Sequence, residues 1–142
     1  MIYLIGSLRN PRIPIIGNRL RKEGFQVWDD WFAGGRNADD EWKVYEEGLG
    51  HTYLEALDGD AALHIYDFDR SHLNACDIGL LVCPAGKSAH LELGYMLGSH
   101  KRGYILLDTS AIRWDVMYKF ANGVYQDVND LIQALRNTHR NE

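Results

Sequence analysis

The stretch "IGLLVCPAGKSAHLELGYMLGSHKRGYILL", from Ile78 to Leu107, shows the clearest alternation of structural patterns in the chain. Its first run, Ile78 to Cys83, is apolar throughout, as expected of a central parallel strand that is buried on both faces. A Pro-Ala-Gly turn follows, then a helical pattern from Ser88, then a second apolar run from Tyr104 to Leu107. This order predicts two parallel strands joined by a helix.

The two ends of the chain repeat this alternation. The short apolar run from Ile2 to Gly6 predicts a buried strand, and Phe25 to Trp28 predicts another. Between them a helical pattern starts at Ile13 and stops at Gly24, a residue that favours helix ends. Near the C-terminus a brief strand precedes an amphipathic helix, for which Asp127 is the predicted N-cap.

Length and composition are those of a single globular domain. A chain of 142 residues can bury a sizeable core, and 46% hydrophobic and 25% charged residues are ordinary proportions. We therefore expect one domain over residues 1–142 with an α/β fold. The predicted architecture is a doubly wound, mostly parallel sheet of the flavodoxin or Rossmann type, with helices on both faces.

Composition also excludes some classes of function. The net charge is −5 and no run of Lys or Arg exceeds two residues, so a broad nucleic-acid surface is not expected. The start "MIYLIGSLRN" lacks the pattern of a signal peptide, and no apolar run has membrane length. The two cysteines, Cys76 and Cys83, are too few for a disulfide framework and are interpreted as packed thiols. We expect a cytoplasmic protein without a membrane or nucleic-acid partner.

Residues 32–60 differ from this pattern, because they are acidic, aromatic and punctuated by glycine. They predict a helical insertion, with one helix that carries Trp42 and Tyr45 and a second helical piece at 51–57. Two interpretations are open: a surface hairpin packed by its aromatic residues, or a cover over an active site.

Candidate site residues lie where the predicted strands end, because doubly wound sheets bind ligands beyond the carboxyl ends of their strands. Together they offer carboxylates, a hydroxyl, an indole and backbone amides, a set that suits a sugar or nucleoside. For Asp29 a strand-end turn and for Trp31 core packing are equally good interpretations. The candidates at strand ends are Gly6, Ser7, Asp29, Asp30, Trp31, Gly86 and Ser88.

Glu92 is the candidate for chemistry. It lies four residues after Ser88, on the same helix face. If Ser88 is the N-cap, the positive helix end should keep Glu92 ionised, and a fixed carboxylate suits attack on an anomeric carbon. The alternative is an ordinary acidic residue near a helix start. Gly94 and Gly98 are predicted to let this helix approach the sheet closely.

Three segments, "IYLIGSL", "DFDRSHLNACDIGLLV" and "GKSAHLELGYMLG", together resemble the nucleoside 2-deoxyribosyltransferase superfamily. That superfamily includes 2′-deoxynucleoside 5′-monophosphate N-glycosidases and CMP hydrolases. The matching features are Asp69, eight residues before Asp77, and the motif Glu92-Leu93-Gly94-Tyr95. The resemblance covers about two thirds of the chain and leaves out most of 32–60.

The resemblance implies a role for each matching residue. Glu92 corresponds to the nucleophile, and Asp69 to the aspartate that assists at the sugar and base. Tyr3 and Gly6 correspond to site elements of the first strand. Ser88 lies in the loop that contacts the 5′-phosphate in the monophosphate enzymes. By pattern alone, Asp69 is also a predicted helix N-cap.

The resemblance further implies a glycosyl-enzyme intermediate that is resolved by a second base or by water, without a metal or organic cofactor. It implies a homo-oligomer, in which Asn122 is a candidate for a residue lent to the neighbouring subunit. Gly86 departs from the pattern, since deoxyribosyltransferases usually carry an acidic residue six positions before the nucleophile.

Two other functions are left open by the sequence. The first is a nucleotide-binding or Toll/interleukin-receptor-like signalling module without catalytic turnover, which the Gly86 departure and the acidic insertion favour. The second is an interaction protein whose contact surface includes Trp42, Tyr45 and Tyr53. His64, His72 and Cys76 lack the short paired spacing of a metal site.

Overall fold

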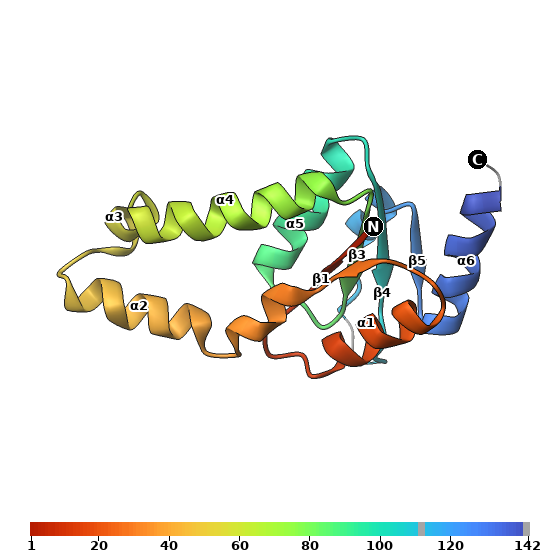
Figure 1. The fold of residues 1–142 in the computed structure, drawn as a ribbon, viewed down its shortest axis with the longest axis horizontal. Coiled ribbons are helices and arrows are strands. Elements are labelled where there is room, and N and C mark those ends of the chain that lie inside the picture. Colours follow the sequence, from red (N-terminus) through yellow and green to blue (C-terminus); the bar gives the residue numbers. More distant parts are fainter. Residues whose placement is uncertain (111–112, 141–142) are drawn as a thin grey trace.

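The computed structural model describes residues 1–110 and 113–140, which form a five-stranded sheet (Figure 1). Neighbouring strands are parallel throughout, in the order β2-β1-β3-β4-β5. The predicted α/β fold is confirmed. The strands are β1 (Ile2–Ile5), β2 (Val27–Trp28), β3 (Ile78–Val82), β4 (Arg102–Leu106) and β5 (Gly123–Tyr125).

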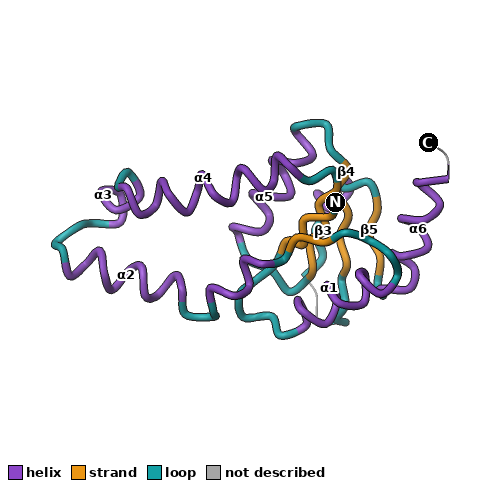
Figure 2. The backbone as a smooth tube through the Cα atoms, in the orientation of Figure 1, coloured by secondary structure: helices purple, strands orange, loops and turns teal. Residues whose placement is uncertain are grey.

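Helices cover both faces of this sheet, as predicted, and Figure 2 shows the strands between them. In the described residues the α-helices are α1 (Arg12–Lys22), α2 (Ala38–Gly48), α3 (Tyr53–Leu57), α4 (Asp60–Ala75), α5 (Lys87–Gly98) and α6 (Val128–Arg140). Two short 3₁₀ helices are η1 (Asp30–Gly34) and η2 (Val116–Phe120).

The sheet separates two hydrophobic cores, because successive residues of a strand point to opposite faces. Along β1, Ile2 and Leu4 pack with apolar residues of α1 and α6. Tyr3 and Ile5 pack with residues of α5 and the last turns of α4. The strand order reverses between β1 and β3, so the crevice expected of this fold opens at their carboxyl ends.

Close packing of α5 against the sheet depends on glycines of the strands. A Cβ on Gly79 would lie 2.8 Å from the sulfur of Met96, and one on Gly103 would be equally close to α5 side chains. A Cβ on Gly94 or Gly98 would meet open space. The prediction for Gly94 and Gly98 was therefore wrong: they share one face of α5, but it is the outer face.

Two predicted helix starts were also wrong. Gly86, with φ −92° and ψ −162°, is the N-cap of α5, so Ser88 is the second helical residue. Asp69 lies in the interior of α4, which begins at Asp60. No Gly or Pro interrupts the chain between Gly59 and Cys76, so nothing delays this helix to Asp69.

The other predicted helix ends are confirmed. α1 ends at Lys22, and Gly24 follows with a left-handed φ of 95°. The Asp127 side chain accepts hydrogen bonds from the backbone amides of Asn129 and Asp130, at 2.9 and 3.1 Å, and so caps α6.

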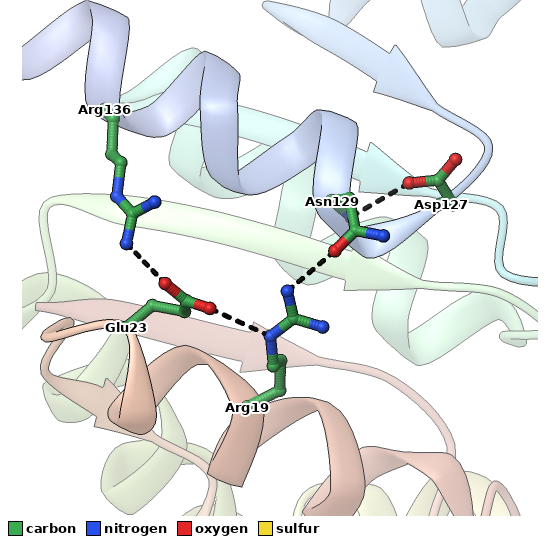
Figure 3. Close-up of polar contacts among 5 residues, drawn as sticks. All are labelled: Arg19, Glu23, Asp127, Asn129 and Arg136. Atoms are coloured by element: carbon green, nitrogen blue, oxygen red, sulfur yellow. Dashed lines mark hydrogen bonds and ion pairs between the residues drawn. The ribbon is translucent and has the colours of Figure 1, made fainter.

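Polar contacts fix α6 against α1 (Figure 3). Glu23 accepts hydrogen bonds from Arg19, at 3.1 Å, and from Arg136. Arg19 also donates to the side chain of Asn129 at 2.7 Å. These contacts lower the pKa of the Glu23 carboxyl, because its charged form is the one that is hydrogen-bonded.

The predicted insertion at 32–60 is helical, and its helices continue into α4. α2, α3 and α4, residues 38–75, form a helical arm that extends away from the sheet (Figure 1). α3 joins the other two at the far end, and a capping box between Thr52 and Glu55 starts it. In the part of the chain that the structure describes, no helix is both long and apolar enough to cross a membrane.

Candidate active site

A cleft of about 800 Å³ lies at the carboxyl ends of the strands and continues between α2 and α4. Its lining comes from four parts of the chain. These are the β1 end (Tyr3, Gly6, Ser7, Leu8, Arg9), the segment after β2 (Asp30, Trp31, Gly34, Arg36), the β3–α5 turn with the start of α5 (Gly86, Lys87, Ser88, Ala89, Glu92) and the arm (Ala38, Asp39, Trp42, Ala62, Ile65, Tyr66, Phe68, Asp69).

The cleft brings Glu92 of α5 and Asp69 of α4 together. Burial raises the pKa of Glu92 to about 7, and the nearby charge of Asp69 adds to the shift. Burial also raises the pKa of Asp69, against a smaller opposing effect of His72. Two coupled carboxyl groups with raised pKa values in a cleft are a common sign of acid–base chemistry.

The sequence interpretation supposed that the helix end keeps Glu92 ionised. In the structure the helix end does not do so. Glu92 is the sixth residue of α5, whereas the favourable field of a helix N-terminus falls off within the first turn. Loss of water around the carboxyl therefore dominates. At neutral pH Glu92 is divided between its neutral and charged forms.

Tyr3 lies beside this pair. Its side chain is buried under the cleft, and the pKa of its phenol is raised, first by burial and then by Glu92 and Asp69. The phenol therefore stays protonated and can act as a hydrogen-bond donor to a charged group.

The other residues of the β1 end form the near wall. Gly6 fits closely there, since a Cβ on it would lie 2.5 Å from the terminal methyl of Ile13, which would have to shift. The Ser7 hydroxyl accepts a hydrogen bond from the backbone amide of Arg9 at 3.1 Å. The Arg9 side chain donates to Asp40 of α2 at 3.1 Å, so an ion pair joins this wall to the arm.

Of the three candidate residues after β2, the structure places two in the cleft and one outside it. The Trp31 indole lines the cleft, and its N–H donates to the backbone carbonyl of Leu4 at 2.7 Å. Asp29 does not line the cleft, because it forms an ion pair with Arg21 of α1. Asp30, one residue further, is the carboxylate that faces the cleft.

The turn between β3 and α5 supplies exposed backbone amides. Gly86, Lys87 and Ser88 are exposed and line the cleft. Gly86 has no side chain with which to cap the helix, and first-turn amides have no acceptor within their own helix. These donors, with the Lys87 ammonium, can hold an anion.

Asn122 lies away from the cleft. Its side chain accepts a hydrogen bond from the backbone amide of Gly103 at 2.9 Å, just before β5 begins. Within its own subunit it therefore links two strands.

Sequence reasoning missed the wall that α4 contributes, and it left open whether residues 32–60 cover the site. Trp42 of α2 and Ile65, Tyr66 and Phe68 of α4 line the cleft, as does Arg36. Their helical spacing was visible, but it did not show that the two helices would border the strand-end crevice. The lining by α2 supports the interpretation of this segment as a cover.

Comparisons with known proteins do not identify a family for this chain. No protein-family model matches the chain, and no curated protein matches it significantly. Across residues 1–110 and 113–140, no group of three or more His, Cys, Asp or Glu side chains is placed to hold a metal ion. Fold and site together define an α/β protein with a carboxyl-lined cleft at the strand-order reversal.

Proposed function

We propose that the protein cleaves or transfers the N-glycosidic bond of a nucleoside or nucleotide, as a member of the superfamily that it resembles. The observation that carries this proposal is the pairing of Glu92 and Asp69 in one aromatic-walled cleft, with coupled, raised pKa values. Glycosidic chemistry commonly uses two carboxyl groups, of which one attacks and the other delivers a proton.

In the first step a carboxylate oxygen of Glu92 forms a bond to C1′ while the bond from C1′ to the base nitrogen breaks. The electron pair of that bond leaves with the base, which takes up a proton. In the second step a water molecule or a second base attacks C1′, releases the Glu92 carboxylate and gives up a proton. Neither step consumes an oxidant or reductant.

The coupled pair can supply the first proton. Burial raises the pKa of both carboxyl groups, and Glu92, with a pKa of about 7, carries a proton in part of the molecules at neutral pH. Such a titration belongs to the pair. When that proton is on Asp69, Glu92 is the charged nucleophile and Asp69 is the acid for the departing base. Tyr3, held protonated beside both groups, can donate a hydrogen bond to the charged one.

The opposite walls suit the rest of a nucleotide. Trp31, Trp42, Tyr66 and Phe68 offer aromatic faces for a base. The β3–α5 turn offers amides and Lys87 for a 5′-phosphate, and Gly86 leaves out the acidic side chain that would repel it. These features favour a 2′-deoxynucleoside 5′-monophosphate over the free nucleoside.

We also propose that the protein works as a homo-oligomer. The helical arm leaves several large apolar side chains half exposed or more, and clusters of exposed apolar residues often mark interaction sites. A second copy would cover them. The exposed apolar residues of the arm outside the cleft are Val44, Tyr45, Leu49, Tyr53, Leu54, Leu57 and Leu63.

Base release, followed by chromatography, tests the proposed reaction over a panel of deoxynucleosides, their 5′-monophosphates and NAD. We expect release from at least one 2′-deoxynucleotide, and a loss of at least about 1,000-fold in Glu92→Gln, because a covalent step loses its nucleophile. Glu41→Gln, on the exposed side of α2, is the matched control and should keep full activity.

Full turnover by Glu92→Gln would contradict the mechanism. Measurable ligand binding without base release from any substrate would instead favour the nucleotide-binding module.

A further inference from the structure

We infer that His90 and Tyr118 are a positioning pair that fixes the turn at 84–87 and thereby its amides, so that the turn recognises the 5′-phosphate of the substrate. The role in recognising the substrate's phosphate rests on the proposed function. The hydrogen bonds of the pair do not depend on it. Neither side chain lines the cleft, whereas Gly86 and Lys87 do. The pair therefore acts through the turn and not by contact with the substrate.

The first contact is between His90 and the carbonyl oxygen of Gly86. The backbone amide of His90 donates to this oxygen at 3.3 Å, and ring atom Nδ1 lies 2.7 Å from it. A carbonyl oxygen only accepts hydrogen bonds, so Nδ1 must carry a proton. In a neutral His90, Nε2 then carries no proton and can accept a hydrogen bond.

The second contact uses that bare nitrogen. Nε2 lies 2.9 Å from the hydroxyl of Tyr118, so the phenol O–H donates to it. The phenol oxygen can in turn accept from the thiol of Cys83, whose sulfur lies 3.7 Å away. Each group then donates a hydrogen bond to the next, from Cys83 through Tyr118 and His90 to the carbonyl of Gly86.

This chain of hydrogen bonds spans the turn. Cys83 directly precedes the turn, and Gly86 lies within it at the start of α5. Cys83 is buried, and Tyr118 packs against the same core from η2. Burial raises the pKa of both groups, which keeps both protonated as donors.

The turn needs this support because its own residues supply little. Gly86 is exposed and has no side chain that could cap α5, and Ser88 makes no capping hydrogen bond. A carbonyl held from outside the turn keeps the following amides aimed at the cleft. A fixed set of donors binds phosphate more tightly than a mobile one, since less freedom is lost on binding.

Three measurements test the pair. In the ligand-free protein, ¹⁵N NMR of the imidazole should find neutral His90 protonated at Nδ1 and bare at Nε2. In Tyr118→Phe, the amides of 86–89 should exchange with solvent faster than in the wild type. Steady-state kinetics should compare the most active deoxynucleoside of the panel with its 5′-monophosphate.

For Tyr118→Phe we expect KM for the monophosphate to rise about 3- to 10-fold, the effect of one hydrogen bond, with kcat within about 2-fold. KM for the free nucleoside should not change. Tyr95→Phe is the matched control on α5, because its hydroxyl donates to Asn74 at 2.6 Å and Tyr95 does not line the cleft. This control should match the wild type in all three measurements.

Three results would overturn the inference: the Nε2-protonated tautomer, unchanged exchange at 86–89 in Tyr118→Phe, or an equal effect of that variant on both substrates. If the wild-type protein releases base from neither substrate, the proposed function fails. The tautomer of His90 and the exchange rates at 86–89 then test the positioning pair by themselves.

Discussion

At the scale of single residues, the site is governed by the removal of water from Glu92. A carboxyl on an exposed helix face would ionise near its ordinary pKa of about 4.3, whereas burial beside Asp69 brings Glu92 to about 7. The same burial that prepares a proton donor or a nucleophile penalises the charged form in the folded state. The site should therefore lower stability at neutral pH.

This effect has a defined sign and pH window. Well below pH 4.5 Glu92 is neutral in both the folded and the unfolded chain, so the site has no effect there. As the pH rises to about 7 the unfolded chain ionises first, and folding loses free energy, on the order of 3 kcal/mol. Above pH 7 the loss is constant.

Urea unfolding of the wild type and Glu92→Gln between pH 4.5 and 8 measures this loss. We expect the variant to gain in stability relative to the wild type up to pH 7 and to keep that gain above it. Glu41→Gln should show no such trend. A difference between wild type and Glu92→Gln that does not change with pH would mean that Glu92 ionises as an exposed residue does.

At the scale of elements, the helical arm raises its own physical question. α2 and α4 leave the sheet together and are joined by α3, yet Tyr45, Leu54 and Leu63 remain more than half exposed. Isolated helices of this length have little stability of their own and depend on packing. We therefore propose that the arm is one half of an interface.

Sedimentation velocity tests this account of the arm. We expect the wild type to be a dimer or larger at micromolar concentration, and Tyr45→Glu combined with Leu54→Glu to be a monomer, because burying two carboxylates is costly. Leu91→Glu is the control, since Leu91 is 74% exposed on α5 and outside the arm. A monomeric wild type, or a double variant that still assembles, would count against the interface.

At the scale of the whole molecule, the sequence predicted the sheet well. Strands such as Ile78–Val82 are continuous apolar runs, and helix ends at Gly24 and Asp127 have strong local signals. The starts of α4 and α5 were misplaced, since helix signals there are weak and Asp69 and Ser88 resemble caps. A cap depends on backbone conformation, which one residue type does not determine.

The candidate site was predicted in part for the same reason. Residues at strand ends could be expected in the cleft because topology alone brings them there, as with Gly6, Ser7 and Ser88. Asp29 could not be told from Asp30, since only the fold shows which carboxylate Arg21 pairs with. The burial that sets the pKa of Glu92 is likewise a property of the folded chain.

The proposed nucleophilic role of Glu92 is tested most directly by trapping the intermediate. Wild type and Glu92→Gln are mixed with the best 2′-deoxynucleoside 5′-monophosphate, quenched with acid during turnover and digested for mass spectrometry. We expect a deoxyribosyl phosphate adduct, joined as an ester to Glu92, in the wild type and in no peptide of the variant. Base release by the wild type without any adduct on Glu92, together with turnover by Glu92→Gln, would contradict the proposed mechanism.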